Sequence, residues 1–247
     1  MRAFWKLTLV ESKLFLREPM AAFFTLAFPL MMLFLFGSIY GNDPTPFFGG
    51  YGTVDVSVPA YTALIIATSG LLTLTINMAS YREQGILRRL RAAPLRPHII
   101  LSAQVTVLFA MTVVGMGLLI LAGKGVYHLR FDGNPWSVLV AFVLSSLSFF
   151  AMGFVLAGLF PTARTAQVVA MVLFYPMIFL SGATLPMEVL PAGIRRAAQV
   201  LPLTHVVTLL RGLWLGEGWG DHLREVGILL ALLVVCVLIS ARTFRWE

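Results

Sequence analysis

Six long apolar runs constrain this sequence more than any other feature. A helix needs roughly 20 apolar residues to cross a hydrocarbon core of about 30 Å. Each run is close to that length and is flanked by charged, glycine or proline residues. The sequence therefore predicts an all-α membrane protein with six transmembrane helices, over residues 20–40, 58–79, 99–122, 136–160, 166–185 and 223–241.

The distribution of charge supports the same fold class. Only 12% of the 247 residues are charged, whereas a soluble domain carries roughly 25%, and the charges cluster between the apolar runs. We expect one membrane domain over 1–247 and no soluble catalytic domain. The net charge of +7 does not indicate a nucleic-acid partner, because membrane topology explains the basic residues. The first apolar run is too long for a signal peptide, and the lone Cys236 cannot form an intrachain disulfide.

Basic residues predict the orientation in the membrane. If the N-terminus lies in the cytosol, twelve of the 18 lysine and arginine residues fall on the cytosolic side and six on the outer side. Cytosolic loops of membrane proteins carry such an excess. An even number of spans also requires both termini on one side. We therefore expect a multi-pass protein of the bacterial inner membrane with both termini in the cytosol.

Residues 1–19 precede the first span and are expected to form an interfacial helix. On a helix the basic residues share one narrow stripe, and apolar residues lie roughly opposite to it. The stripe contains Arg2, Lys6, Lys13 and Arg17, and the apolar side contains Phe4, Leu7 and Leu14, interrupted by Glu11 and Glu18. Two interpretations remain open: a basic anchor on anionic lipid, and an elbow helix that also touches a cytosolic partner.

The segment 186–222 is too apolar for a solvated loop and too broken for a span. Pro186, Pro191 and Pro202 interrupt it. Pro202 fits the first turn of a helix that runs to about residue 215 and stops at Gly216. We therefore expect short external re-entrant helices that dip into the outer leaflet before the last span.

Several kinds of functional site are missing from the sequence. No charged residue or histidine lies in the middle of a span, which disfavours ion-coupled transport. The nearest string to a phosphate-binding loop, Gly123-Lys124-Gly125, lacks the first glycine and the final serine or threonine of that motif. We expect no catalytic residue and no metal site, because no two histidines are spaced as ligands on one helix face; they are His98, His128, His205 and His222. If ATP drives this protein, another chain must hydrolyse it.

The loop after the second span, residues 81–97, carries the strongest positive signal. Placed on a helix, it has one face with an acid and apolar side chains, namely Glu83, Ile86, Leu87 and Leu90. Arginines occupy the remainder, and Pro94 ends the helix. Such a helix would bind lipid phosphates through its arginines, but an acid beside anionic headgroups is unfavourable. We therefore favour docking of this face in the groove of a partner protein.

This loop resembles that of the ABC-2 family of ATP-binding-cassette exporter permeases, in the drug-resistance and NodJ-like group. The family pattern is an acid, a glycine two residues later, Leu-x-x-Leu and a proline, here Glu83, Gly85, Leu87, Leu90 and Pro94. Residues 201–216 are similar to the family segment before the last span, with Pro202, His205, Leu210, Arg211 and Gly216 in place. Glu11, Arg17 and Pro19 fit the looser pattern of the elbow helix. The resemblance covers essentially the whole chain.

The resemblance implies a half-transporter. Two permease subunits, identical or paralogous, would pair in the bilayer above two ATP-binding-cassette ATPase subunits. Those partners would bind ATP and magnesium, and this chain would hold no cofactor of its own. The loop would form a cytosolic coupling helix that receives force from the ATPase through Glu83, Gly85, Ile86, Leu87, Arg88, Leu90 and Pro94.

Spans two and five lie at the dimer axis in related proteins, so their polar, aromatic and methionine side chains are candidates for a substrate cavity. They are Tyr61, Ser69, Thr73, Asn77, Phe174, Tyr175 and Met177. Packing or lipid contact is the alternative for each of them. Aromatic and methionine side chains suit hydrophobic or amphiphilic solutes, so we expect export of a drug-like or lipid-like substrate. A permease for a lipid-linked polysaccharide and a permease-like sensor that transports nothing are the other candidates.

Overall fold

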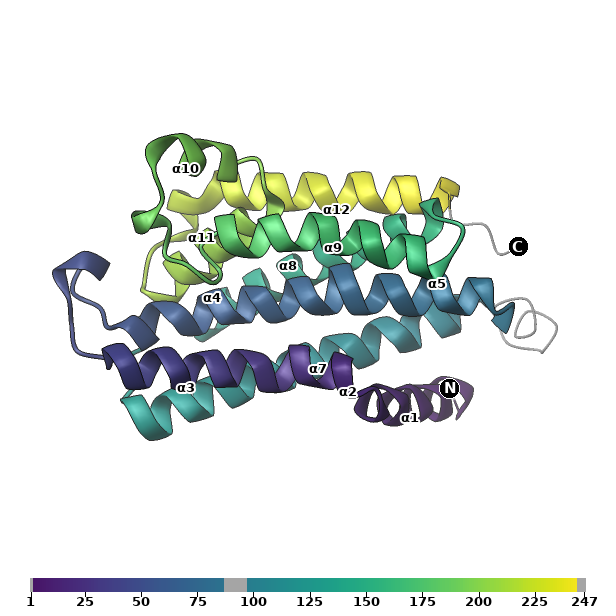
Figure 1. Ribbon diagram of the computed structural model, residues 1–247, viewed down its shortest axis with the longest axis horizontal. Coiled ribbons are helices and arrows are strands. Elements are labelled where there is room, and N and C mark those ends of the chain that lie inside the picture. Colours follow the sequence, from purple (N-terminus) through teal and green to yellow (C-terminus); the bar gives the residue numbers. More distant parts are fainter. Residues whose placement is uncertain (1, 87–96, 244–247) are drawn as a thin grey trace.

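The computed structural model describes residues 2–86 and 97–243, and the regular structure in these two ranges is entirely helical. Six helices are long and apolar enough to cross a membrane, which confirms the predicted fold class. They are Pro19–Tyr40, Thr53–Glu83, Leu101–Tyr127, Pro135–Leu159, Ala163–Leu180 and Trp219–Arg242. Figure 1 shows them side by side in one elongated bundle.

Two of the spans consist of three helical pieces each. Span one joins α2 (Pro19–Ala22), the π-helix η1 (Phe23–Ala27) and α3 (Phe28–Tyr40). Span two joins α4 (Thr53–Ala67), the π-helix η3 (Thr68–Leu74) and α5 (Thr75–Glu83). A π-helix closes its hydrogen bonds one residue later than an α-helix, and such segments are frequent at functional sites.

The other four spans are formed mainly by single helices, and shorter helices connect them. The single helices are α7 (Pro97–Tyr127), α8 (Pro135–Leu159), α9 (Ala163–Leu180) and α12 (Leu223–Thr243). The shorter ones are α1 (Arg2–Arg17), η2 (Pro46–Phe48), η4 (Met187–Val189), α10 (Ala192–Ala198), α11 (Pro202–Trp214) and η5 (Trp219–His222).

Several spans differ in length from the prediction, and two of the differences have a local cause. Span two begins at Thr53 rather than 58, because the fully buried Asp55 supports the start of the helix. Its carboxylate accepts the N–H of Gly52 at 3.0 Å and the side-chain amide of Asn42 at 2.8 Å. Span five ends at Leu180 rather than 185, since Gly182 adopts φ +87° and turns the chain out of the helix.

Span two is the central helix of the bundle. In its most apolar stretch 83% of the residues are buried by the rest of the same chain, against 11% in the last span. It packs against α3, α7, α8, α9 and α11, whereas α12 packs mainly against α8 and α11. The chain therefore encloses span two and leaves most of the last span to the surroundings.

Spans two and four cross at a pair of glycines. A Cβ atom on Gly153 would collide with the carbonyl oxygen of Gly70, and a Cβ on Gly70 would lie 2.7 Å from the backbone of Phe149. The hydroxyl of Thr75 donates to the carbonyl of Gly153 at 3.3 Å. Small residues allow such close approach of membrane helices, so this crossing requires glycine at both positions.

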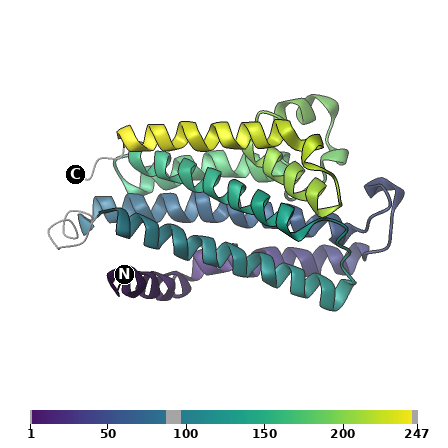
Figure 2. The same cartoon turned by 180° about the vertical axis from the view of Figure 1, so that it is seen from behind.

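The two ends of the bundle carry different elements (Figures 1 and 2). One end holds α1, residues 83–86 and the last turn of α12, and we call it the elbow end. The opposite end holds η2, α10 and α11, and we call it the α11 end. The first and last described helices thus meet the elbow end, as an even number of spans requires.

The helix α11 has the start and the end that the sequence predicts for a helix after Pro202. It runs from Pro202 to Trp214, and Gly216 follows with φ +92°. Nearly all of its side chains are buried, and it packs against α4, α8, α9 and α12. The indole N–H of Trp214 donates to the backbone carbonyl of Arg130 at 3.1 Å. The hydroxyl of Tyr51 donates to the backbone carbonyl of Leu215, also at 3.1 Å. These bonds anchor α11 to two separate loops at its end of the bundle.

Candidate functional site at the elbow end

The last residues of span two hold the turn between spans four and five. The guanidinium of Arg82 donates to the carbonyl oxygens of Gly158, at 2.8 Å, and of Phe160. The carboxylate of Glu83 accepts the N–H of Ala163, the first residue of α9, at 2.7 Å. An acid at a helix N-terminus interacts favourably with the free N–H groups and the helix dipole. We call these contacts of Arg82 and Glu83 the clamp.

The clamp changes the interpretation of the predicted coupling helix. The helix of span two ends at Glu83, and Gly85 adopts φ +67°, so Glu83 does not share a helix with Ile86 as expected. One oxygen of its exposed carboxylate accepts the N–H of Ala163, and the carboxylate can accept further hydrogen bonds. Leu87, Arg88, Leu90 and Pro94 lie outside the described residues. Glu83 therefore contacts span five of its own chain, while its contact with the ATPase and the role of the loop in receiving force remain predictions.

The helix α1 docks on the bundle through an acid. Phe15 is 4% exposed and Glu11 is 6% exposed, while Leu14, expected on the apolar side, is half-exposed. The hydroxyl of Tyr81 in α5 lies 2.9 Å from both carboxylate oxygens of Glu11. Burial raises the pKa of the Glu11 carboxyl above its usual range, and the hydrogen bond from Tyr81 lowers it by a smaller amount. The acid that interrupts the apolar side in the sequence is thus part of the docking contact.

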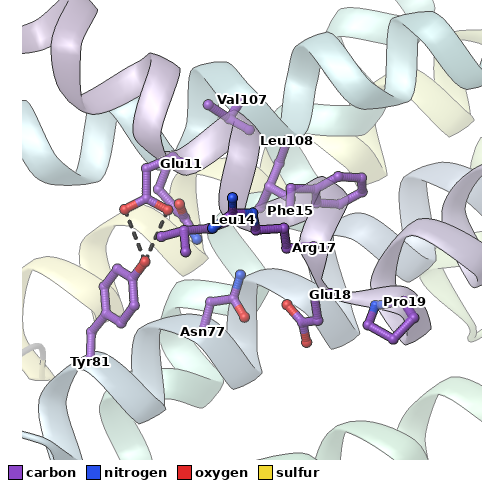
Figure 3. Close-up of a pocket in the computed structure, with 11 residues that line it drawn as sticks. Glu11, Leu14, Phe15, Arg17, Glu18, Pro19, Asn77, Tyr81, Val107 and Leu108 are labelled. Atoms are coloured by element: carbon purple, nitrogen blue, oxygen red, sulfur yellow. Dashed lines mark hydrogen bonds between the residues drawn. The ribbon is translucent and has the colours of Figure 1, made fainter.

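A cavity of about 400 Å³ lies between α1, α5 and α7. All three residues predicted for the elbow pattern line it, namely Glu11, Arg17 and Pro19. Figure 3 shows Glu11 and Tyr81 meeting at one part of the cavity, with Asn77 and Glu18 on its other side. The wall from α7 consists of Gln104, Val107 and Leu108. The cavity therefore joins a polar, charged part to an apolar wall.

The docking of α1 is expected to weaken as the pH rises. The raised pKa means that the docked state of α1 binds the Glu11 proton more tightly than the undocked state. Docking of α1 is therefore most favourable at a pH below the ordinary pKa of a glutamate. As the pH rises from that value to the raised pKa, the free energy of docking weakens by at most about 1.4 kcal/mol per pH unit. Of the other lining residues, Arg17, Glu18 and Tyr81 are charged or titratable, and α7 contributes none. Glu11→Gln should remove this pH dependence and dock more tightly at neutral pH.

Hydrogen exchange of the α1 amides measures this effect. The ratio of protection in Glu11→Gln to protection in the unmodified chain cancels the intrinsic pH dependence of exchange, and it should grow between about pH 4.5 and neutrality. A ratio that stays constant with pH would show that docking of α1 does not raise the pKa of Glu11.

The predicted substrate-cavity residues do not gather at one site. Tyr61, Ser69 and Thr73 are buried within the bundle, because span two lies at its centre. Asn77 lines the cavity beneath α1, and Tyr61 lines a small cavity of about 30 Å³ near the α11 end with Arg211 and Pro186. Phe174 and Met177 are buried, whereas Tyr175 is half-exposed on the outer face of α9. Only Tyr175 among them faces substantially away from the folded chain.

Of the residues predicted at the α11 end, His205 connects α11 to its neighbours. Ring atom Nε2 of His205 lies 2.9 Å from the carbonyl oxygen of Gln199, and its Nδ1 lies 3.9 Å from the carboxylate of Glu225 in α12. Nε2 of His222 lies 2.8 Å from the carboxylate of Glu217. Sequence spacing did not reveal that two histidines and two acids meet here. No group of three possible ligands suited to a metal ion is present within residues 2–86 and 97–243.

Three residues of the elbow end were missed from the sequence. Arg82 is expected only among the arginines of the loop 81–97, with no contact of its own, and the sequence assigns no contact to Tyr81 or Gln104. The available signal was Glu11, since an acid on the apolar side of an amphipathic helix needs a polar partner when that side is buried. The identity of that partner depends on the tertiary structure, because Tyr81 is far away in the sequence.

Comparison with known proteins adds an independent line of evidence. Residues 2–215 match the ABC-2 type transporter family. The chain is 26% identical over 245 residues to the transport permease YvfS of Bacillus subtilis, which covers 97% of this chain and 96% of the relative. It is 32% identical over 128 residues to nodulation protein J of Rhizobium leguminosarum bv. trifolii, covering 50% and 49%. It is 23% identical over 160 residues to the multidrug ABC transporter permease YbhR of Escherichia coli, covering 65% and 44%.

Proposed function

Because this chain belongs to the ABC-2 type transporter family, we propose that it exports a hydrophobic or amphiphilic solute across a bacterial inner membrane. It is the permease subunit of an ABC transporter and is embedded in the membrane by six spans. Permeases of this family work with separate ATP-binding-cassette ATPase subunits, which carry the ATPase activity. In our proposal the elbow end faces the cytosol, and two ATPase subunits bind ATP and magnesium beneath a pair of permeases.

The clamp is the observation that carries the coupling of this permease to its ATPase. Residues 84–96 follow directly on Arg82 and Glu83, which bind the turn before α9. Force applied to this loop by the ATPase would therefore move the inner ends of spans two and five together. A partner biases such a two-state element only through different contacts in the two states, and in our proposal the loop makes these contacts.

The outer face of α9 supports a role at the permease–permease interface. Four of its apolar side chains, spaced three or four residues apart, are between 49% and 65% exposed, namely Val168, Val172, Tyr175 and Phe179. This spacing places them on one stripe of the helix. We propose that the stripe faces the second permease copy, identical or paralogous, and that Tyr175 lines the substrate path between them. Of the residues predicted in span five to line a substrate cavity, only Tyr175 is kept in this proposal.

A drug-like or lipid-like solute fits the apolar character of this path. The similarity to YbhR, which is named a multidrug permease, points the same way. A lipid-linked polysaccharide would need a path lined by hydrogen-bonding groups along its length. The apolar stripe on α9 therefore favours the amphiphile.

Reconstitution of the chain with its ATPase in proteoliposomes tests the proposal. Amphiphilic drugs and lipid-like solutes are expected to raise ATP turnover and to be transported, and an Asp replacement of Tyr175 should reduce both. Val140→Asp supplies a control at an equally exposed position of another span, in α8. Stimulation by a lipid-linked glycan alone would establish the other export function, and ATP turnover that responds to no solute would favour a sensor.

A further inference from the structure

The cavity beneath α1 contains an acid whose charge the chain does not balance. Glu11 is 6% exposed, and within the described residues no lysine or arginine nitrogen lies within 4.0 Å of its carboxylate. The Tyr81 hydroxyl supplies one proton to the two carboxylate oxygens. A carboxylate accepts about four hydrogen bonds, so acceptor capacity remains. A buried, incompletely compensated carboxylate is stabilised by a cation.

Two amides add further unused polar groups to the same cavity. Gln104 is only 2% exposed and lines the cavity, and its side-chain amide makes no hydrogen bond within the described part of the chain. Asn77 lines the cavity from α5, likewise without a hydrogen bond to its side chain among those residues. Buried amides are nearly always hydrogen-bonded in folded proteins. Because Gln104 lines the cavity, its amide is available to a ligand there.

The polar groups match one chemical class. We propose that the cavity binds the primary ammonium group of an amphiphile whose tail lies in the adjacent leaflet. A primary ammonium has three N–H donors and no acceptor, and the side chains of Glu11, Gln104 and Asn77 all carry oxygen acceptors. Leu14, Phe15, Val107 and Leu108 form the apolar wall along which the alkyl stem lies. The volume of about 400 Å³ holds such a headgroup and the first part of its tail.

Two sources of this chemistry are distinguishable. One is the ethanolamine headgroup of a membrane lipid, whose phosphate would lie near Arg17 at the cavity edge. The other is a free amphiphilic amine. Neither depends on the proposed export function, because binding needs neither ATP nor the ATPase subunit.

Photo-crosslinking tests the site in the unmodified chain. The full chain is placed in phosphatidylcholine nanodiscs, which contain no primary amine, with a twelve-carbon alkylamine that carries a diazirine in its tail. The label should map to peptides from α1 and α7. Dodecylamine in about tenfold excess over the probe should reduce labelling about tenfold, because both amines compete for the same site. Labelling should be unchanged by dodecyltrimethylammonium, which has no N–H donor, and by dodecanol. Equal displacement by all three would overturn the proposal.

Variants and lipid composition complete the experiment. Glu11→Gln and Gln104→Leu should each reduce labelling by about tenfold, whereas Asp43→Asn, at an exposed acid near the opposite end of the bundle, should leave it unchanged. Unchanged labelling in both cavity variants would overturn the assignment. If added phosphatidylethanolamine suppresses labelling, the natural ligand is the lipid headgroup. If dodecylamine suppresses labelling but phosphatidylethanolamine does not, the ligand is a free amine. The comparison of probes on the unmodified chain stays decisive if a variant does not fold.

Discussion

Gly153→Ala is expected to lower the free energy of unfolding by about 3 kcal/mol or more, and Gly153→Val to leave no folded protein. The added Cβ would collide with the carbonyl oxygen of Gly70, which is backbone and has no other rotamer to adopt. Spans two and four would have to separate along their whole crossing. A loss of about 3 kcal/mol corresponds to a fall in Tm of about 6–12 °C for a chain of this size.

Thermal unfolding in nanodiscs measures this change, and Gly117→Ala is the matched control. Gly117 lies within α7, and a Cβ there would meet no atom within 4 Å. The control should be neutral or slightly stabilising, by up to about 1 kcal/mol, because alanine favours the helix more than glycine. If Gly153→Ala and Gly117→Ala melt at the same temperature, the close crossing of spans two and four is wrong.

Breaking the clamp is expected to uncouple export from ATP hydrolysis. Arg82→Ala and Glu83→Ala each remove charge-assisted hydrogen bonds between span two and the turn before α9. A coupling free energy of this kind is about 1–3 kcal/mol, so export per ATP hydrolysed should fall about 5–150-fold. Export and ATP turnover in proteoliposomes measure the effect, and co-purification of the ATPase checks assembly. Arg164→Ala removes an exposed charge from the same turn and should behave as the unmodified chain.

Ala163→Pro separates the clamp from direct docking of Glu83 on the ATPase. Ala163 is the first residue of α9 and Thr162 before it is extended, with φ −121° and ψ 150°, so proline fits there without disturbing the helix. It removes only the N–H that Glu83 accepts. If the clamp transmits force, Ala163→Pro should match Glu83→Ala. Full coupling in Ala163→Pro together with loss in Glu83→Ala would place the role of Glu83 at the ATPase instead.

The order of helices was predictable because apolar length and punctuation are local properties. All six spans and the helix from Pro202 to Trp214 follow from run length, proline and glycine. The start of span two was predicted too late because Asp55 looked like a loop residue. Its partners are Asn42 and the backbone N–H of Arg130, at 2.8 and 2.9 Å, and both lie outside span two. Only the folded chain brings them together.

The candidate site was harder to predict because it depends on contacts between distant segments. Glu11 was recognised as part of the elbow, but Tyr81 and Gln104 come from two other helices. Helix periodicity also placed Glu83 on one helix face with Ile86, which is wrong because the regular helix ends at Glu83 and Gly85 turns the chain. In span two the π-helix η3 shifts the helix faces on either side of it, so a uniform period of 3.6 residues does not describe which side chains face outward. Ser69 and Thr73 lie in that segment.

The enclosure of span two has a consequence for biogenesis. This helix leaves the ribosome before spans four and five are made, yet those later helices cover Ser69, Thr73 and the close approach at Gly70. Until then its hydroxyl-bearing side chains face lipid or the insertion machinery rather than protein, and most of the contacts that hold the bundle do not exist. Closure around the central helix is therefore a late step of synthesis, and truncation after span three should yield a product that quality-control proteases degrade.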